Sequence, residues 1–159
     1  MSKERELISV LEKQLDRADN LLAAVEKALR NDIPKIGRTG NAAVMVAGLV
    51  ENYYSCLETA YHKISQHFEN SLDSERWHID LLNKMTLRIE GIRVAAVSEP
   101  AFGPLQELQR FRHFKRYYFD LEYDWDRIDF IVKKLRQAHP LAKADLQNFI
   151  GFLEDVLKP

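Results

Sequence analysis

One stretch of the chain, residues 109–119, combines the residue types that bind the phosphates and bases of nucleic acids. Its four cations lie between aromatic side chains, and they are Arg110, Arg112, Lys115 and Arg116. An arginine guanidinium can bind a phosphate through two parallel hydrogen bonds, and an aromatic ring can stack on a base. We therefore expect Arg112, Lys115 and Arg116 to bind RNA or phosphate. The alternative is an amphipathic helix whose basic face is solvated and pairs with the acidic stretch 122–129.

Other residues that could carry chemistry form weaker patterns. His62 and His67 are five positions apart, which places them about 140° apart on a helix, so they do not converge on a metal ion. Residues 37–41, Gly-Arg-Thr-Gly-Asn, could hold an anion at a helix start, but a turn with a helix cap is the favoured interpretation. Cys56 is the single cysteine and lies in an apolar stretch, so we expect a buried, inert thiol. We expect no metal and no cofactor.

Length and composition indicate one folded domain over residues 1–159. Apolar residues make up 46% of the chain and charged residues 30%, unlike a disordered protein. The net charge of −1 excludes a generally basic nucleic-acid-binding protein, although not a local basic patch. The longest weakly polar run, residues 42–50, is too short for the roughly 20 residues of a membrane-spanning helix. Since the charged N-terminus lacks a signal-peptide pattern, the sequence predicts a cytoplasmic protein without membrane contact.

The elements that must position these residues are helices. Apolar residues between positions 7 and 29 recur at intervals of three and four, as one face of a helix requires. The expected helices cover residues 3–30, 42–69 with Asn41 as cap, a segment from a Ser74 cap to Gly91, 104–119, 125–138 and 141–157. Between them we expect a loop at 34–40, a turn at 70–74, an extended connector at 92–97 and a break at His139-Pro140. The predicted fold class is an all-α bundle of five or six helices in a single domain.

Four sequence motifs follow one another along the chain. They are Gly-Leu-Val-Glu-Asn-Tyr-Tyr at 48–54 leading to Glu58, Trp-His-x-x-Leu-Leu-x-x-Met at 77–85, Phe-Arg-His-Phe at 111–114 and Leu-Glu-x-Asp-Trp at 121–125. In order and spacing they resemble the HepT-like branch of the HEPN superfamily, over about residues 40–135. The resemblance implies an all-α bundle that forms a homodimer and cleaves RNA without a metal ion, often as the toxin of a toxin–antitoxin pair. It also implies a small nucleotidyltransferase as antitoxin partner, which in some pairs attaches AMP to a tyrosine of the toxin.

The active-site motif of that family is Arg, a polar residue, three further residues, His, one residue and Tyr. Position by position, Arg112 matches the arginine and His113 the polar residue, but Tyr117 stands at the histidine position and Phe119 at the tyrosine position. The resemblance implies that Arg112 binds the scissile phosphate and that His113 and Tyr117 occupy the catalytic positions. Because an unperturbed tyrosine has a pKa near 10, Tyr117 is a poor general base at pH 7.

The sequence leaves three functions open. The first is an endoribonuclease toxin in which His113 substitutes for the missing histidine. The second is a catalytically inactive HEPN protein that binds a nucleotidyltransferase partner, RNA or a nucleotide. The third is a helical dimerisation scaffold whose basic helix is only a solvated face.

Overall fold

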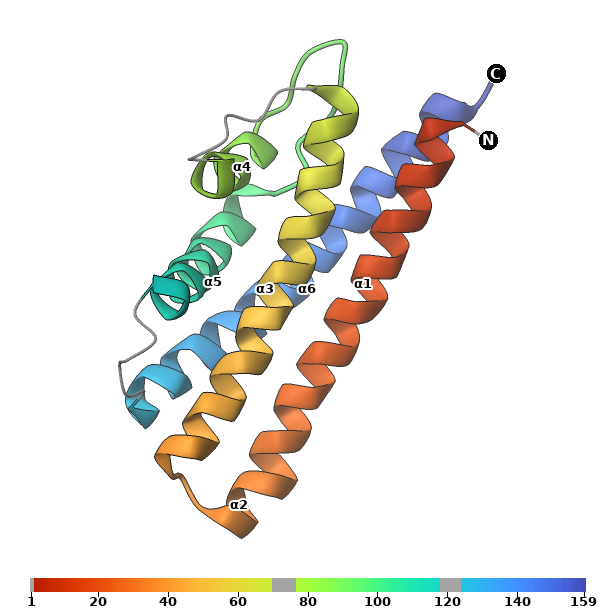
Figure 1. Ribbon diagram of the computed structural model, residues 1–159. Helices are drawn as coiled ribbons and strands as arrows, with labels where there is room; N and C mark the ends of the chain where they lie inside the picture. Colours follow the sequence, from red (N-terminus) through yellow and green to blue (C-terminus); the bar gives the residue numbers. More distant parts are fainter. Residues whose placement is uncertain (1, 70–76, 118–123) are drawn as a thin grey trace.

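The computed structural model describes residues 2–69, 77–117 and 124–159, except for the side chains of residues 77–79 and 114–117. Its elements are α1 (Lys3–Lys27), the π-helical turn η1 (Ala28–Asp32), α2 (Ile33–Ile36), α3 (Gly40–Phe68), α4 (Trp77–Met85), α5 (Glu99–Tyr117) and α6 (Trp125–Leu157). Within these ranges the chain forms no strand, only an isolated bridge between Ile89 and Arg93. The predicted all-α fold is therefore confirmed (Figure 1).

Helix α3 is the central element of the bundle. It contacts α1, α4, α5 and α6, and Figure 1 shows α1 on one side of it and α4 with α5 on the other. Its N-terminal half is apolar on most sides, which suits burial among several neighbours. Farther along it carries three tyrosines that are at most 1% exposed, Tyr53, Tyr54 and Tyr61. Side chains of α3 can therefore meet partners on several helices.

The chain beyond α1 stays helical for longer than predicted. The helix expected to end at residue 30 continues to Ile36, because the π-helical turn follows α1 directly and the Ile33 N–H donates to Ala28 O, five residues back. Both Ala28 and Ile33 are buried, and the wider turn keeps both of them on the core side. Pro34 lies within this continuous helical stretch, in the first turn of α2, where its missing N–H leaves out one backbone hydrogen bond.

The predicted loop at 34–40 shortens to residues 37–39. Gly37 ends α2 with a φ of 86°, a left-handed conformation that favours glycine. The cap of α3 is Thr39 rather than Asn41, because Thr39 has an extended backbone and its Oγ1 accepts a hydrogen bond from the Ala42 N–H at 3.1 Å.

Helix α4 ends at Met85 and not near Gly91. Gly91, with a φ of 74°, instead lies in the turn that follows the helix. Residues 92–97 form the predicted connector, but it consists of a turn residue, a bridge residue and bends rather than one extended segment. The turn predicted at 70–74 and its Ser74 cap lie outside the described residues.

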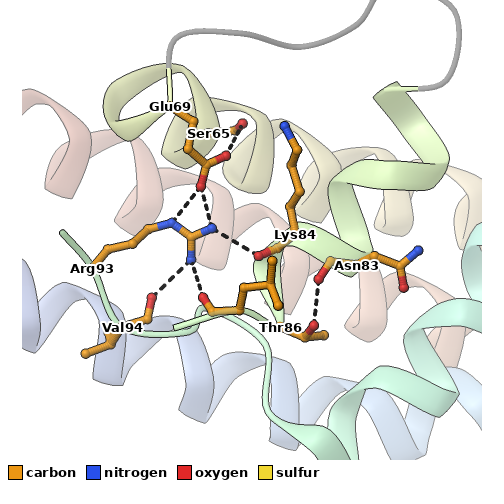
Figure 2. A network of polar contacts seen from close by, with 8 residues as sticks. Ser65, Glu69, Asn83, Lys84, Thr86, Arg93 and Val94 are labelled. Atoms are coloured by element: carbon orange, nitrogen blue, oxygen red, sulfur yellow. Dashed lines mark hydrogen bonds and ion pairs between the residues drawn. The ribbon is translucent and has the colours of Figure 1, made fainter. Parts of the chain in front are cut away.

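A buried arginine explains the early end of α4. Arg93 is 3% exposed, and its guanidinium occupies the space beyond the last turn of the helix (Figure 2). It donates hydrogen bonds to the carboxylate of Glu69 and to the backbone oxygens of Lys84, Leu87 and Val94. Carbonyls at a helix end need such donors, and Arg93 supplies them while joining α4 to the end of α3.

Helix α5 begins at Glu99, five residues before the predicted start at Pro104. Pro104 lies inside the helix, where it removes one backbone donor. Leu105 and Leu108 follow it and are fully buried, so packing against the core holds the helix together at this point. Its predicted end at Phe119 lies outside the described residues.

The predicted break at Pro140 is wrong, because α6 runs through it as one helix of 33 residues. The ranges 125–138 and 141–157 are thus two halves of a single element. A proline in a helix interior costs about 3 kcal/mol. Buried side chains on both sides of it offset that cost, and they are Leu135, Ala138, Ala142 and Leu146. No helix in the described ranges is both long enough and apolar enough to cross a membrane.

Candidate functional site

Arg112 is turned inward from α5 towards the central helix α3. Leu108, one turn earlier, is fully buried and the neighbouring Phe111 is 5% exposed, so this side of α5 is packed. Arg112 Nη1 donates to Glu58 Oε1 on α3 at 2.5 Å, and the two side chains are 19% and 7% exposed. An ion pair with so little contact with water is screened by salt much less than a surface pair.

The side of α3 that carries Glu58 is also little exposed to water. Tyr54, one helical turn before Glu58, is 1% exposed. Burial, and then the negative charge of Glu58, raise the pKa of Tyr54 well above its usual value, so the phenol stays protonated. Arg112 Nε is buried and has no hydrogen-bond acceptor among the described residues. A carboxylate therefore holds one nitrogen of the guanidinium, whereas another donor lacks an acceptor.

The other expected site residues are placed only in part. The His113 side chain is exposed, and since successive helical residues point about 100° apart, it does not share the inward direction of the preceding arginine. Lys115, Arg116 and Tyr117 continue α5, but their side chains are outside the described part of the structure. Phe119 lies wholly outside it. The catalytic roles of His113 and Tyr117 and the phosphate contacts of Lys115 and Arg116 remain predictions.

Within the segment 37–41, residues 37–39 form a turn that side chains hold, and α3 begins at Gly40. Arg38 pairs with Asp129 on α6 at 2.5 Å, and its guanidinium lies 4.4 Å from the centre of the Trp125 ring. Trp125 Nε1 in turn donates to Thr39 O at 3.0 Å. Arg38, the cation of the segment, is thus paired with a carboxylate and an aromatic ring. This agrees with the interpretation as a turn with a helix cap rather than with an anion site.

Two other histidines take part in polar contacts between helices. His67 Nε2 is 3.7 Å from Glu4 Oε1. His139 lies between Tyr53 and Asp19, with 2.7 Å from Nδ1 to the Tyr53 hydroxyl and 2.7 Å from Nε2 to Asp19 Oδ1. Across residues 2–69, 77–117 and 124–159, no three His, Cys, Asp or Glu side chains gather where they could hold a metal ion.

Cys56 is the buried thiol that its apolar surroundings predict. Its Sγ donates to Gln14 O at 2.9 Å, between α3 and α1. Burial raises the pKa of the Cys56 thiol to about 11, which leaves little of the reactive thiolate at neutral pH. This residue therefore joins two helices and is unsuited to be a nucleophile.

The sequence interpretation assigned no role to Glu58, although the residue carried a usable signal. Glu58 follows Tyr54 and Leu57 and precedes Tyr61 on the apolar face of α3, and a carboxylate on such a face needs a buried cation. The sequence did not indicate which cation, because Arg112 is 54 positions away.

The structure defines an all-α protein in which a buried ion pair joins the central helix to a basic helix. Comparison with known families agrees, since a family model described as HepT-like protein matches residues 45–153. The chain belongs to the HepT-like family. No curated protein and no solved structure matches it.

Proposed function

We propose that this HepT-like protein acts on RNA in a bacterial toxin–antitoxin or defence system, with Arg112 binding the RNA phosphate. A difference between two arginines of α5 supports the proposal. The Arg110 side chain is 65% exposed and lies 3.5 Å from Glu107, as on a solvated basic face. The Arg112 side chain is 19% exposed and is held by a buried carboxylate. A solvated face does not require an inward, fixed arginine, so this observation argues against the interpretation of α5 as only a solvated basic face.

The proposed reaction is RNA cleavage without a metal ion. The ribose 2′-oxygen loses its proton and attacks phosphorus, the bond to the 5′-oxygen breaks, and that oxygen gains a proton. Arg112 would stabilise the negative charge that develops on the phosphate oxygens. His113 would exchange the protons, because a tyrosine at position 117 is a poor base at neutral pH. We therefore expect slow cleavage.

A second function, binding without cleavage, is favoured by the two departures from the family motif. Tyr117 replaces the histidine, and Phe119 has no hydroxyl that could accept AMP. A protein of this kind would hold RNA, a nucleotide or a nucleotidyltransferase partner without acting on it. In both functions, cleavage of RNA and binding without cleavage, Arg112 would be the residue that binds the phosphate.

Cleavage of single-stranded RNA by the purified protein in EDTA tests the proposal. Wild type is compared with Arg112→Ala, with Tyr117→His and with Arg110→Ala as the matched control. Because a group that stabilises transition-state charge contributes about 10²–10³-fold, we expect Arg112→Ala to abolish the slow cleavage. Arg110→Ala should stay within about threefold of wild type, as exposed ion pairs contribute little.

The outcomes separate the two functions. Cleavage by wild type that disappears in Arg112→Ala supports the nuclease. Cleavage by Tyr117→His alone supports a binding protein that has lost its base. If Arg112→Ala cleaves and binds RNA as well as wild type does, both functions are contradicted.

A further inference from the structure

The buried carboxylate next to Arg112 is too enclosed to contact RNA. Glu58 is 5% exposed, so the residue cannot reach a ribose or a phosphate at the surface. It lies on the central helix α3, whereas Arg112 lies on α5, and the two helices pack against each other. Among the contacts of the described residues, the ion pair with Arg112 is the route by which Glu58 can influence a substrate.

The buried arginine Arg93 shows what a purely structural ion pair looks like in this protein. Arg93 Nε and Nη2 both donate to Glu69, and the remaining donors bind the backbone oxygens of Lys84, Leu87 and Val94 (Figure 2). All three guanidinium nitrogens are engaged, and the Arg93 side chain is 0% exposed. The Arg93 guanidinium therefore has no nitrogen left to bind a phosphate.

The guanidinium of Arg112 is held differently. Among the described residues it makes one hydrogen bond, from Nη1 to Glu58 Oε1. Its Nε is buried and has no acceptor in the same part of the chain, so the 19% of the side chain that reaches solvent lies on its other atoms. The carboxylate thus holds Nη1, whereas Nη2 makes no hydrogen bond to a described residue.

We propose that Glu58 is the positioning residue for Arg112, holding Nη1 so that the rest of the guanidinium is directed at an RNA phosphate. This inference rests on the proposed function. A fixed guanidinium loses less conformational entropy when it binds than a free one does, so Glu58 strengthens binding that Arg112 performs. The fixed orientation also leaves Nη2 to donate a charge-assisted hydrogen bond to a phosphate oxygen.

Three substitutions separate positioning from charge. Glu58→Gln removes the charge but keeps an oxygen that can accept from Nη1. Glu58→Ala removes both. Glu58→Asp keeps the charge and withdraws the carboxylate by one methylene. Glu107→Ala, which removes an exposed carboxylate from α5 itself, is the matched control.

The experiment is binding of a short fluorescent 2′-O-methyl RNA, which cannot be cleaved by attack of the 2′-oxygen, measured by anisotropy over a range of salt. We expect Glu58→Ala and Arg112→Ala each to weaken binding by about tenfold. Each should also reduce the slope of log K against log salt by about 0.7, the value for one lost phosphate contact on a single strand. Glu58→Gln should stay within about threefold of wild type, and Glu107→Ala should keep the wild-type slope.

The double variant Glu58→Ala/Arg112→Ala decides whether Glu58 acts through Arg112. If it does, Glu58→Ala has no further effect on binding or on the salt slope when the arginine is absent. An equal effect in both backgrounds, or no effect of Glu58→Ala where Arg112→Ala has one, overturns the inference while leaving the proposed function intact. Wild-type binding by Arg112→Ala overturns both.

Circular dichroism melts establish that each variant is folded at the assay temperature. If Glu58→Ala is unfolded there, Glu58→Asp takes its place in the same comparison. If Glu58 positions Arg112, the withdrawn carboxylate of Glu58→Asp weakens RNA binding and lowers the salt slope. A folded Glu58→Asp variant with wild-type binding and a wild-type slope would refute the inference.

Discussion

Arg93 and Arg112 each pair with a carboxylate on α3 or at its end, and the hydrogen bonds around the two arginines indicate different roles. Arg93 binds Glu69 and three backbone oxygens with no exposed side-chain surface. Arg112 binds one carboxylate and keeps 19% of its side chain exposed. A residue that satisfies helix ends stabilises the fold, whereas one with remaining donors can bind a ligand. Residue type alone does not distinguish the two.

At this scale we predict that Arg93→Met destabilises the protein by about 3–5 kcal/mol, because it leaves a carboxylate and several helix-end carbonyls without their donor. The free energy of unfolding in urea, followed by circular dichroism, measures the loss. Arg88→Met, at an exposed position of the same turn, is the control and should change stability by less than about 0.5 kcal/mol. A loss of under about 1 kcal/mol for Arg93→Met would contradict the capping role.

At the scale of elements, polar side chains join α1 to α6 along one side of the bundle. Asp19 accepts from Lys143 Nζ at 2.8 Å and contacts His139 Nε2, and Glu26 accepts two hydrogen bonds from Arg136. Both carboxylates lie on α1, and their partners lie on α6 on either side of Pro140. These contacts add to the buried packing that keeps α6 continuous through the proline.

The α1–α6 contacts predict a loss of stability in acid. The hydrogen bond from Lys143 lowers the pKa of Asp19, and the hydrogen bond from Arg136 lowers the pKa of Glu26. A carboxyl group whose pKa is lower in the folded state stabilises that state above its unfolded pKa, and the contribution disappears as the pH falls through the folded value. Asp19→Asn/Glu26→Gln should therefore be less stable than wild type at pH 7 and lose less stability between about pH 5 and pH 3.

Urea midpoints across that pH range measure this effect. Asp16→Asn, at an exposed position of α1, is the control and should follow the wild-type curve. Parallel curves for wild type and the double variant would show that the two carboxylates do not contribute to acid sensitivity.

At the scale of the whole molecule, the family match covers most of the bundle but not α1. The matched residues 45–153 contain nearly all of α3 to α6, and α1 packs against α3 and α6 from outside that range. Several large apolar side chains are exposed on the described surface, among them Val44 at 51% and Phe130 at 47%. An additional chain could bury such side chains in an interface.

We predict that the protein is a homodimer in solution, as the family resemblance implies. Size-exclusion chromatography with light scattering should give twice the mass of the chain, and dilution should shift the mass towards that of one chain. A mass of one chain at every concentration would contradict the prediction and would confine the site to the residues of a single protomer.

The sequence by itself determined the helical fold, because the period of apolar residues is a local property that can be read along the chain. It also determined the basic character of residues 109–116 and the inert surroundings of Cys56. It misplaced the helix boundaries at Pro34 and Pro140, because backbone propensity is local whereas packing by distant helices decides whether a proline ends a helix.

Only the tertiary structure decided which charges meet. Glu58 could be recognised as a carboxylate on an apolar face, but its partner Arg112 is 54 positions away on another helix. Arg110 and Arg112 are two residues apart in one basic stretch, yet one lies in solvent and the other faces α3. The physical reason is that a buried charge needs an opposite charge within contact distance, and the packing of α5 on α3 supplies that distance.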